Sequence, residues 1–316
     1  NMTMAATATT PTSIEACGGG LIGGIPALTT IRLADLVVRD IRITAQNING
    51  GLFGGGAQYF HRVTMRNIHI TADAAVAAAP LNDGSGLLGS TRGAIQGGLI
   101  YPSDMMYIED SYFLDISVVA ISISGGMINS EGNSVVRNAV IRNCNVTVST
   151  VRGPQLVYMF VNGPPTGGLI QFDRDADIYG LLITDSHFAN LGLYDHVPPL
   201  LNMTAGALAR MSAAGGLVTF ARFLTAYGAI YTASTRKRLV NSTIRDSTVT
   251  TSGYGDINGG ALCVVDAIAY LEDVTISNVI SSTSGTGNVR GGALSLVVYQ
   301  LRGADEVTAV TMNNTI

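Results

Sequence analysis

The stretch "GGALCVVDAIAYLEDVTISNV" runs from Gly259 to Val279, and "GGALSLVV" opens the same motif again at Gly291. A motif that recurs every few tens of residues is typical of a solenoid, in which each unit buries its interior only by stacking on its neighbours. Paired glycines recur along the whole chain, and apolar residues follow most of them. The pairs begin at Gly23, Gly50, Gly97, Gly125, Gly167, Gly215, Gly259 and Gly291.

An Asp or Asn follows each of the first seven glycine pairs, at 17 to 19 residues from the first glycine except after Gly215, where the spacing is 31. Apolar residues lie two before this position and mostly one and three after it, which is a period-two pattern with a phase slip. A straight strand cannot absorb the slip, because every later side chain would change faces. The pattern therefore predicts a strand, a corner and a second strand around Asp40, Asn67, Asp115, Asn143, Asp185, Asp246 and Asn278.

The residue types between these corners favour strands, since Val, Ile and Thr are common and Gly, Asn and Asp punctuate them. We expect an all-β fold, a single-stranded parallel β-helix of about eight rungs with long loop insertions, stacked at ~4.8 Å. The Asp and Asn side chains would form a ladder at one corner, and glycines would open another corner. Stacked carboxylates repel, so we expect these corners to be partly wet, or the Asp side chains to cap backbone amides.

The GGAL motif followed by a strand and an Asn-bearing turn resembles the GGA[ILV] repeats of polymorphic membrane protein passenger domains. More broadly, the chain is similar to the right-handed parallel β-helix superfold of pectate lyases and autotransporter passengers. The resemblance covers roughly residues 18–310 and implies a right-handed coil. It implies no single function, because this scaffold carries both enzymes and inert rods.

The chain divides into an extended segment at 1–17, the solenoid at 18–303 and a C-terminal strand at 304–316 that could lie between subunits. Long excursions at Thr71–Gln96, Ser149–Thr166, Ala189–Ala214 and Thr219–Arg238 are expected to gather on one face. Neither terminal segment resembles an amphipathic helical plug. We expect strand edges at the ends that associate with further copies; the alternative is that capping elements belong to a longer chain.

Composition narrows the function classes. The 316 residues are 47% hydrophobic and 6% aromatic, with no Trp and a net charge of −4. This balance gives no broad basic face for nucleic acid, and the Arg236-Lys237-Arg238 run is predicted to be a solvated loop. No apolar run approaches 18 residues, so no transmembrane helix is expected. Cys144 and Cys263 fall at positions that predict buried, unlinked thiols.

N-glycosylation sequons occur at Asn1, Asn145, Asn202, Asn241 and Asn313. They favour an extracellular or cell-surface glycoprotein. Asn145 is expected to point outward from its strand.

The best candidate site for chemistry is "DRDAD", where Asp173, Asp175 and Asp177 alternate. In an extended segment the three carboxylates would share one face and could hold a hard cation such as Ca²⁺. The competing interpretation is a solvated turn without a cofactor. Asp110 occupies another repeat position, polar also at Asp35, Asn138, Asn241 and Asp273, which indicates a structural role. His69 and His187 are expected to face outward, without metal spacing.

The leading hypothesis is a non-catalytic extracellular building block that assembles end to end into a surface fibre, coat or adhesin, with copies of itself and N-linked glycans as its partners. The alternative is a lyase or glycoside hydrolase that acts on acidic polysaccharide. No Asp-Asp, Gly-His-Gly or Arg-Ile-Lys signature supports that alternative. A glycan-binding module is disfavoured by the scarcity of aromatic residues.

Overall fold

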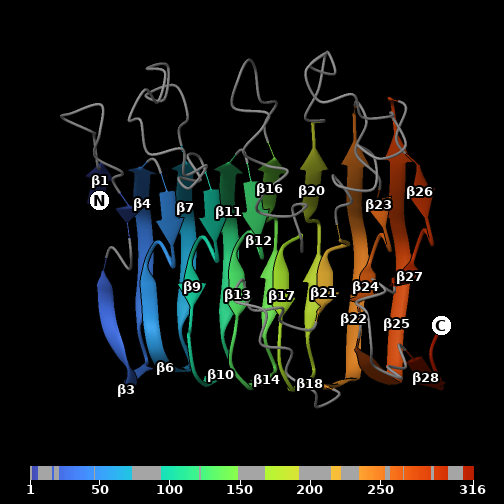
Figure 1. The fold of residues 1–316 in the computed structure, drawn as a ribbon, viewed down its shortest axis with the longest axis horizontal. Helices are drawn as coiled ribbons and strands as arrows, with labels where there is room; N and C mark the ends of the chain where they lie inside the picture. Colours follow the sequence, from blue (N-terminus) through green and yellow to red (C-terminus); the bar gives the residue numbers. More distant parts are fainter. Residues whose placement is uncertain are drawn as a thin grey trace, which may run out of the picture.

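The structure, a computed structural model, describes residues 2–5, 16–17, 21–45, 47–72, 94–120, 122–148, 168–191, 215–221, 235–252, 257–265, 267–285, 288–297 and 309–316. Within these residues it contains 28 strands and no helix. Twenty-two strands form one sheet whose pairings are all parallel, with smaller sheets of four and two strands. The expected all-β parallel solenoid is confirmed (Figure 1). Asn1, Asn202 and most of the long excursions lie outside the described residues.

Each turn of the solenoid has three faces, which we call first, second and third in chain order. The first face leads to a first corner and carries β3 (Ile22–Ala34), β6 (Phe53–His61), β10 (Met106–Glu109), β14 (Ser134–Arg137), β18 (Ala176–Tyr179), the starts of β22 (Arg236–Thr251) and β25 (Ile268–Thr283), and β28 (Ala309–Asn313). The second face is the short segment between the first and second corners. The third face follows the second corner.

The second and third faces carry β4 (Val37–Ala45), β7 (Thr64–Ala72), β11 (Tyr112–Ala120), β15 (Val140–Arg142), β16 (Asn145–Val148), β19 (Leu182–Thr184), β20 (His187–Asn190) and the later parts of β22 and β25. The strand β1 (Met2–Ala5) pairs with β4 on the third face. Equivalent residues of successive turns lie in register, as in Val38↔Met65 and Phe113↔Ile141.

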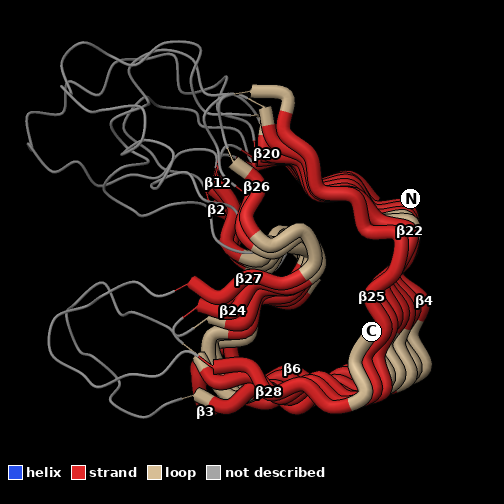
Figure 2. Tube along the Cα trace, turned by 90° about the vertical axis from the view of Figure 1, so that its right-hand side faces the viewer, coloured by secondary structure: helices blue, strands red, loops and turns tan. Residues whose placement is uncertain are grey.

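A third, glycine-rich corner follows the third face. Short strands precede it: β2 (Ala16–Cys17), β5 (Asn47–Asn49), β8 (Ala94–Gln96), β12 (Ser122–Ser124), β23 (Ile257–Asn258) and β26 (Val289–Arg290). Others follow it: β9 (Ile100–Tyr101), β13 (Ile128–Ser130), β17 (Ile170–Phe172), β21 (Val218–Phe220), β24 (Leu262–Val265) and β27 (Leu294–Val297). Viewed along the axis, the turns superimpose and this corner folds inward toward the centre (Figure 2).

The corners confirm the backbone prediction. All seven predicted Asp and Asn residues have positive φ, between 49° and 57°, so the strand bends at each of them. Asn and Asp tolerate this left-handed conformation better than other residues with a side chain. The recurrent polar position five residues earlier is also a corner, with φ from 46° to 69° at Asp35, Arg62, Asp110, Asn138, Gly180, Asn241, Asp273 and Asn314. The chain therefore turns twice where the sequence had indicated one bend.

Between the corners, alternate side chains point into a continuous apolar core of Val, Ile, Leu and Phe. A void of about 10 Å³ lies among Met106, Phe113 and Ile170. A water molecule needs a cavity of about 10–15 Å³ with polar partners. This void is too small to hold a ligand, and its apolar lining offers no hydrogen-bond partner to a water molecule.

Candidate functional site

The second corner carries a ladder of paired Asp and Asn side chains. Asn67 Nδ2 donates to Asp40 Oδ1 at 2.6 Å, and Asn143 Nδ2 donates to Asp115 Oδ1 at 2.7 Å. The last pair repeats the pattern, with Asn278 Nδ2 2.8 Å from Asp246 Oδ1. In each pair the Asn belongs to the later turn. The ladder therefore has a direction along the axis.

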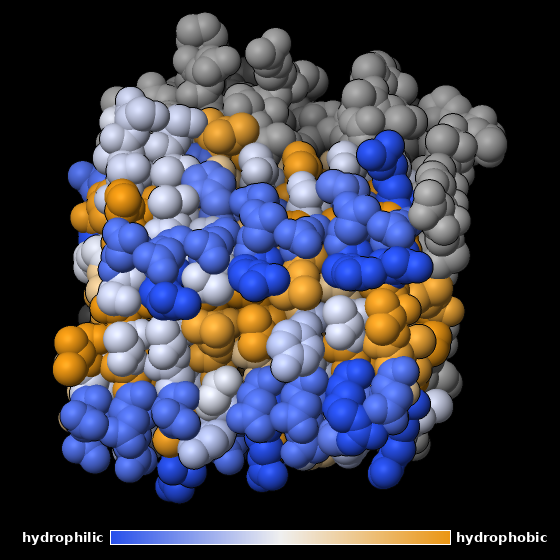
Figure 3. Space-filling model, turned by 180° about the vertical axis from the view of Figure 1, so that it is seen from behind, coloured by the Kyte–Doolittle hydropathy of each residue, from blue (hydrophilic) through white to orange (hydrophobic). Residues whose placement is uncertain are grey.

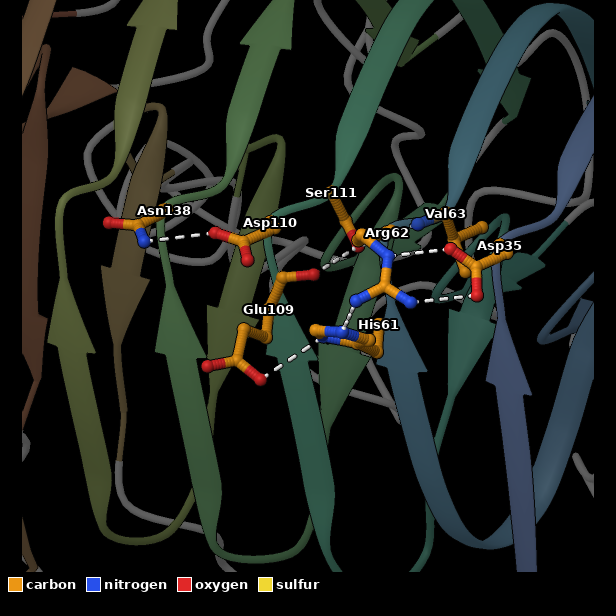
Figure 4. Close-up of polar contacts among 8 residues, drawn as sticks. All are labelled: Asp35, His61, Arg62, Val63, Glu109, Asp110, Ser111 and Asn138. Carbon is orange, nitrogen blue, oxygen red and sulfur yellow. Dashed lines mark hydrogen bonds and ion pairs between the residues drawn. The ribbon is translucent and has the colours of Figure 1, made fainter.

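The first corner follows the same rule with more varied residues (Figure 4). Asn138 Nδ2 donates to Asp110 Oδ1 at 2.9 Å, and Asn314 Nδ2 donates to Asp273 Oδ1 at 2.5 Å. Arg62 replaces Asn in the second turn and makes two bonds to Asp35, at 2.5 and 2.7 Å. This guanidinium holds the pKa of the Asp35 carboxyl below its usual value.

These contacts decide between the two expectations for the corners. The side chains lie at the surface, with 33% exposure at Asp40 and 63% at Asp35. An amide or guanidinium of the following turn contacts most of the carboxylates, so direct stacking of two carboxylates is largely avoided. In the second-corner row, only Asp185 and Asp246 are consecutive acids, because their strands β19 and β22 are in register. The corners are partly exposed to solvent, which is the first of the two expectations.

Serines complete the corners from inside. The Ser111 hydroxyl accepts from the Val63 N–H at 3.2 Å and donates to the carbonyl of Glu109, two residues before it. Ser242, immediately after a first corner, does the same for the Leu181 N–H at 3.1 Å. Ser186 and Ser247 play this part at the second corner. Each hydroxyl satisfies a buried backbone donor that the bend takes out of the strand ladder.

The cysteine predictions are confirmed. Cys144 takes a post-corner position like these serines, and its thiol lies 3.4 Å from the Arg142 carbonyl. Cys144 and Cys263 are both buried and unlinked. Burial raises the pKa of each thiol to about 12, so neither is a reactive thiolate near neutral pH.

The predicted metal cluster does not form. Strand β17 ends at Phe172 and β18 begins at Ala176, so the segment bends instead of running extended. Asp173 is buried, while the Asp175 carboxylate accepts the Arg236 N–H at 2.9 Å. Asp177 is exposed and lies 3.6 Å from an Arg238 nitrogen. No group of three metal-ligating side chains gathers anywhere in the described part of the chain.

The prediction that Arg236-Lys237-Arg238 is a solvated loop was wrong for its central residue. Lys237 is fully buried in β22. Its Nζ donates to the Phe172 carbonyl at 2.9 Å and to the Arg174 carbonyl. Its in-register neighbours are Ala176 and Ala269, whose small side chains leave room for the long stem. Sequence alone hides this arrangement, because the alanines lie 61 and 32 residues away.

A buried acid, Asp173, lies near this lysine. Gln171 Nε2 donates to Asp173 Oδ1 at 2.7 Å. Burial raises the Asp173 pKa to about 6, and burial lowers the Lys237 pKa to about 7 although the carboxylate opposes that change. Tyr101 donates to Glu131 nearby, and burial raises the tyrosine pKa. Perturbed pKa values of this kind occur in active sites and in structural networks alike. Since Lys237 is inaccessible here, the cluster ties β22 to the turn after β17.

The remaining sequence candidates lie at the surface. Asn145 is exposed on the third face, in register with Ser117 and His187, as predicted for an outward position. Asn241 is exposed at the first corner and Asn313 is exposed in β28. His69 is exposed and His187 is half-buried, with the Thr248 hydroxyl beside its ring.

On the second face, in-register rows of side chains form bands on the surface. A band of apolar and small side chains runs between two hydrophilic bands (Figure 3). The apolar band follows the in-register row that includes Val37 and Tyr112, which are 59% and 46% exposed. The hydrophilic bands follow the two corner ladders.

The two ends of the solenoid are the only parts of the described core that remain incomplete. Core residues that are only partly buried fall into two groups, Ile22, Leu33 and Leu36 in the first turn, and Ile276, Val279, Val289, Leu294 and Val310 in the last. Leu296 and Met312, whose equivalents Val264 and Leu271 are buried, are 50% and 59% exposed.

Comparison with known proteins adds no relative. No family model, curated protein or solved structure matches the chain. Among the described residues there is no helix long and apolar enough to cross a membrane.

Proposed function

We propose that this protein is a non-catalytic structural building block, a β-solenoid rod that assembles end to end into a fibre or coat at the cell surface. One observation carries the proposal: among the described residues, the core side chains that are only partly buried lie in the first and the last turn of this chain. Apolar surface that is exposed at one defined place favours association there. Burying it stabilises the associated state by about 25 cal/mol for each Å² removed from water.

The strand edges support the same conclusion. On the third face, Val279–Thr283 of β25 pairs with β22 on one side and with no other described strand. On the first face, β28 likewise pairs only with β25. Such edges present unpaired N–H and C=O groups that accept a further parallel strand. A contact between two different ends is heterologous and does not close, so it produces filaments.

Sedimentation velocity and negative-stain electron microscopy of the 316-residue chain test this function. We expect a concentration-dependent series of species that lengthen along one axis while their width stays constant. A single monomeric species across the concentration range would contradict the proposal. Side-by-side sheets without axial growth would contradict it equally.

The proposal includes secretion and N-glycosylation. The exposed positions of Asn145, Asn241 and Asn313 support it, because a glycan on any of them would project away from the core. Mass spectrometry of the protein from its native source, before and after enzymatic release of N-glycans, tests this part. Unmodified asparagine at all five sequons would overturn it without affecting the assembly.

A second candidate function is depolymerisation of acidic polysaccharide. The observation that favours it is the cluster of Tyr101, Glu131, Asp173 and Lys237, in which burial shifts the pKa of the Asp and the Lys toward neutrality. Incubation with pectin-like and alginate-like polymers, for the parent chain and for Asp173→Asn, tests it. Activity that is lost in Asp173→Asn would favour the enzyme, whereas no activity in either chain would remove this candidate.

A further inference from the structure

The second face presents three outward rows of side chains that run along the solenoid axis. The middle row contains no charged residue; it consists of Val37, Thr64, Tyr112, Val140, Leu182, Thr243 and Thr275, which lie in register. Two residues further along each turn lies the arginine row, in which four of seven positions are Arg39, Arg66, Arg142 and Arg245. Two residues before the middle row lies the first-corner row, which carries Asp35, Asp110 and Asp273. A basic row and an acidic row therefore flank an uncharged row at equal distances.

We propose that this face is an interface between two copies of the chain, related by a two-fold axis parallel to the solenoid axis. That rotation places the middle row of one copy on the middle row of its partner. Because each flanking row lies two residues away, or about 6.6 Å, it also places the arginine row of each copy on the first-corner row of the other. This is the self-complementary contact of a symmetric dimer. The inference does not depend on the proposed end-to-end assembly.

The charges match under this rotation. Asp35 and Arg39 belong to the same turn, so each Asp35 faces Arg39 of the partner copy. Asp110 belongs to the turn between those of Arg66 and Arg142, because Leu114 of that turn is in register with both arginines. Asp273 lies one turn after Arg245, since Ser277 is in register with Arg245. Each of the three carboxylates thus lies within one turn, about 4.8 Å along the axis, of an arginine of the partner.

The opposite orientation lacks this match. A two-fold axis that lies in the interface across the solenoid axis would reverse one copy. It would place the arginine row on the partner's arginine row, and the first-corner row on the partner's first-corner row. Like charges that face each other across an interface suppress association. The charge pattern therefore selects parallel pairing over antiparallel pairing.

Contacts within one chain leave these arginines able to bind a partner. Arg39 Nε lies 3.8 Å from Asp40 Oδ2, and an Arg245 nitrogen lies 3.5 Å from Asp246 Oδ2. Such exposed ion pairs contribute little, and a guanidinium has five N–H donors to share. Arg62 is the one cation of the first-corner row, and its two hydrogen bonds to Asp35 match its charge within the chain.

The middle row gives the interface its apolar contact. It forms the centre of the apolar band between the hydrophilic bands in Figure 3. Val37 and Tyr112, which are 59% and 46% exposed, would each pack against the same residue of the partner. Aromatic side chains are enriched at such interfaces. The face measures about 29 Å by 13 Å, or roughly 400 Å² on each copy. An interface of this size is weak on its own.

One sequon lies inside the proposed interface. Asn241 belongs to the first-corner row, so a glycan on it would separate the two copies. Asn145 lies on the third face and Asn313 on the first. Pairing therefore requires an unmodified Asn241 and is compatible with glycans at the other two positions.

Chemical cross-linking of unglycosylated chains tests the pairing and its orientation. We mix a Thr64→Cys chain with a size-tagged Thr243→Cys chain, both in a Cys17→Ser background, and add a bismaleimide of about 10 Å reach, the distance between sheets packed face to face. Cys144 and Cys263 are buried and their raised pKa keeps them protonated. The matched control is Thr71→Cys, which replaces a threonine of the same turn as Thr64 on the third face.

Parallel pairing predicts dimers that link Thr64→Cys to itself and Thr243→Cys to itself, at least tenfold more abundant than the Thr71→Cys dimer. The mixed dimer should be rare, because these positions lie four turns, or about 19 Å, apart along the axis. Antiparallel pairing centred on Val140 predicts the reverse. An excess of the mixed dimer, or yields no higher than in the control, overturns the proposal.

A charge exchange tests the match between the flanking rows. Arg142→Glu should lower the yield of the Thr64→Cys dimer at least fivefold, and adding Asp110→Arg to the same chain should restore it to within twofold. Arg62 shows that the first-corner row accepts an arginine with positive φ. Circular dichroism confirms that each variant is folded. A loss without rescue overturns the charge match. None of these outcomes bears on end-to-end assembly, which axial growth tests separately.

Discussion

Two copies of one motif differ only in what lies above them. Gly259–Leu262 belongs to an interior turn, and Gly291–Leu294 belongs to the last. A Cβ at Gly260 would lie 2.1 Å from the Gly292 carbonyl oxygen, whereas a Cβ at Gly292 meets nothing. The same motif is therefore more tightly packed in the interior turn than in the last turn, because in a solenoid each residue contacts the neighbouring turn as much as its own.

The largest effect is expected from replacing these glycines. Gly260→Ala forces its Cβ against both Ser281 Oγ, at 1.8 Å, and the Gly292 carbonyl, and should lower the free energy of unfolding by roughly 3 kcal/mol or more. Gly292→Ala should change it by less than about 0.5 kcal/mol. Urea denaturation at a concentration too dilute for assembly measures both. Equal losses at the two sites would break the comparison.

Core truncation should show the same asymmetry with a smaller amplitude. Leu271 is 2% exposed, and Met312 occupies the same row one turn later at 59% exposure. Leu271→Ala should cost roughly 2–5 kcal/mol, because it leaves a cavity in a packed interior. Met312→Ala should cost less than about 1 kcal/mol in the monomer. If assembly buries Met312, its variant should also weaken filament growth, which light scattering records.

The burial of Lys237 and Asp173 between neighbouring turns also predicts that the free energy of unfolding depends on pH. The pKa of Lys237 is lowered to about 7, so between pH 7 and 10.5 the unfolded chain binds a proton that the folded chain lacks. Stability should therefore rise with pH from 7 to about 9, by roughly 1–3 kcal/mol. Above pH 9 the buried thiols of Cys144 and Cys263, whose pKa is raised to about 12, oppose the rise. The pKa of Asp173 is raised to about 6 from 3.8, so its contribution falls as pH rises between these values.

Lys237→Met separates the two groups, since Asp173, Asp175 and Glu131 remain as the charged groups around the site. The rise in unfolding free energy between pH 7 and pH 9 should disappear, while the fall between pH 4 and pH 6 persists. Denaturant midpoints at pH 4, 6, 7 and 9 test this. An unchanged rise in the variant would assign the pH dependence to other groups.

The smallest difference between the interior and the last turn is expected at the polar corners, where the two should agree. Asn143 and Asn314 both have positive φ and each donates to an Asp of the preceding turn. Asn→Ala at either site should cost about 1–3 kcal/mol through a lost hydrogen bond and left-handed strain. Asn→Gly, the control, keeps the backbone relaxed and should cost about 1 kcal/mol. A cost at Asn143 several times that at Asn314 would show that covering turns constrain these corners after all.

Some features of the structure could be predicted from the sequence, and others could not. The all-β solenoid, the inward rows and the seven Asp or Asn corners could be predicted, because a phase slip in a period-two pattern is local information. The second set of corners was underestimated, since Arg62 and Gly180 interrupt its pattern of Asp and Asn. The proposed metal cluster failed because a bend of three residues after Phe172 separates carboxylates that an extended strand would have aligned.

By itself, the sequence determined where the chain bends and which side chains face the core, because steric limits on φ and alternation along a strand act within a few residues. Tertiary structure alone decided which polar groups meet. The directed Asn-to-Asp ladder joins residues 27 to 41 positions apart, and Lys237 reaches a carbonyl 65 positions away. Excursions of unequal length separate the turns, so only their stacking brings these partners into register.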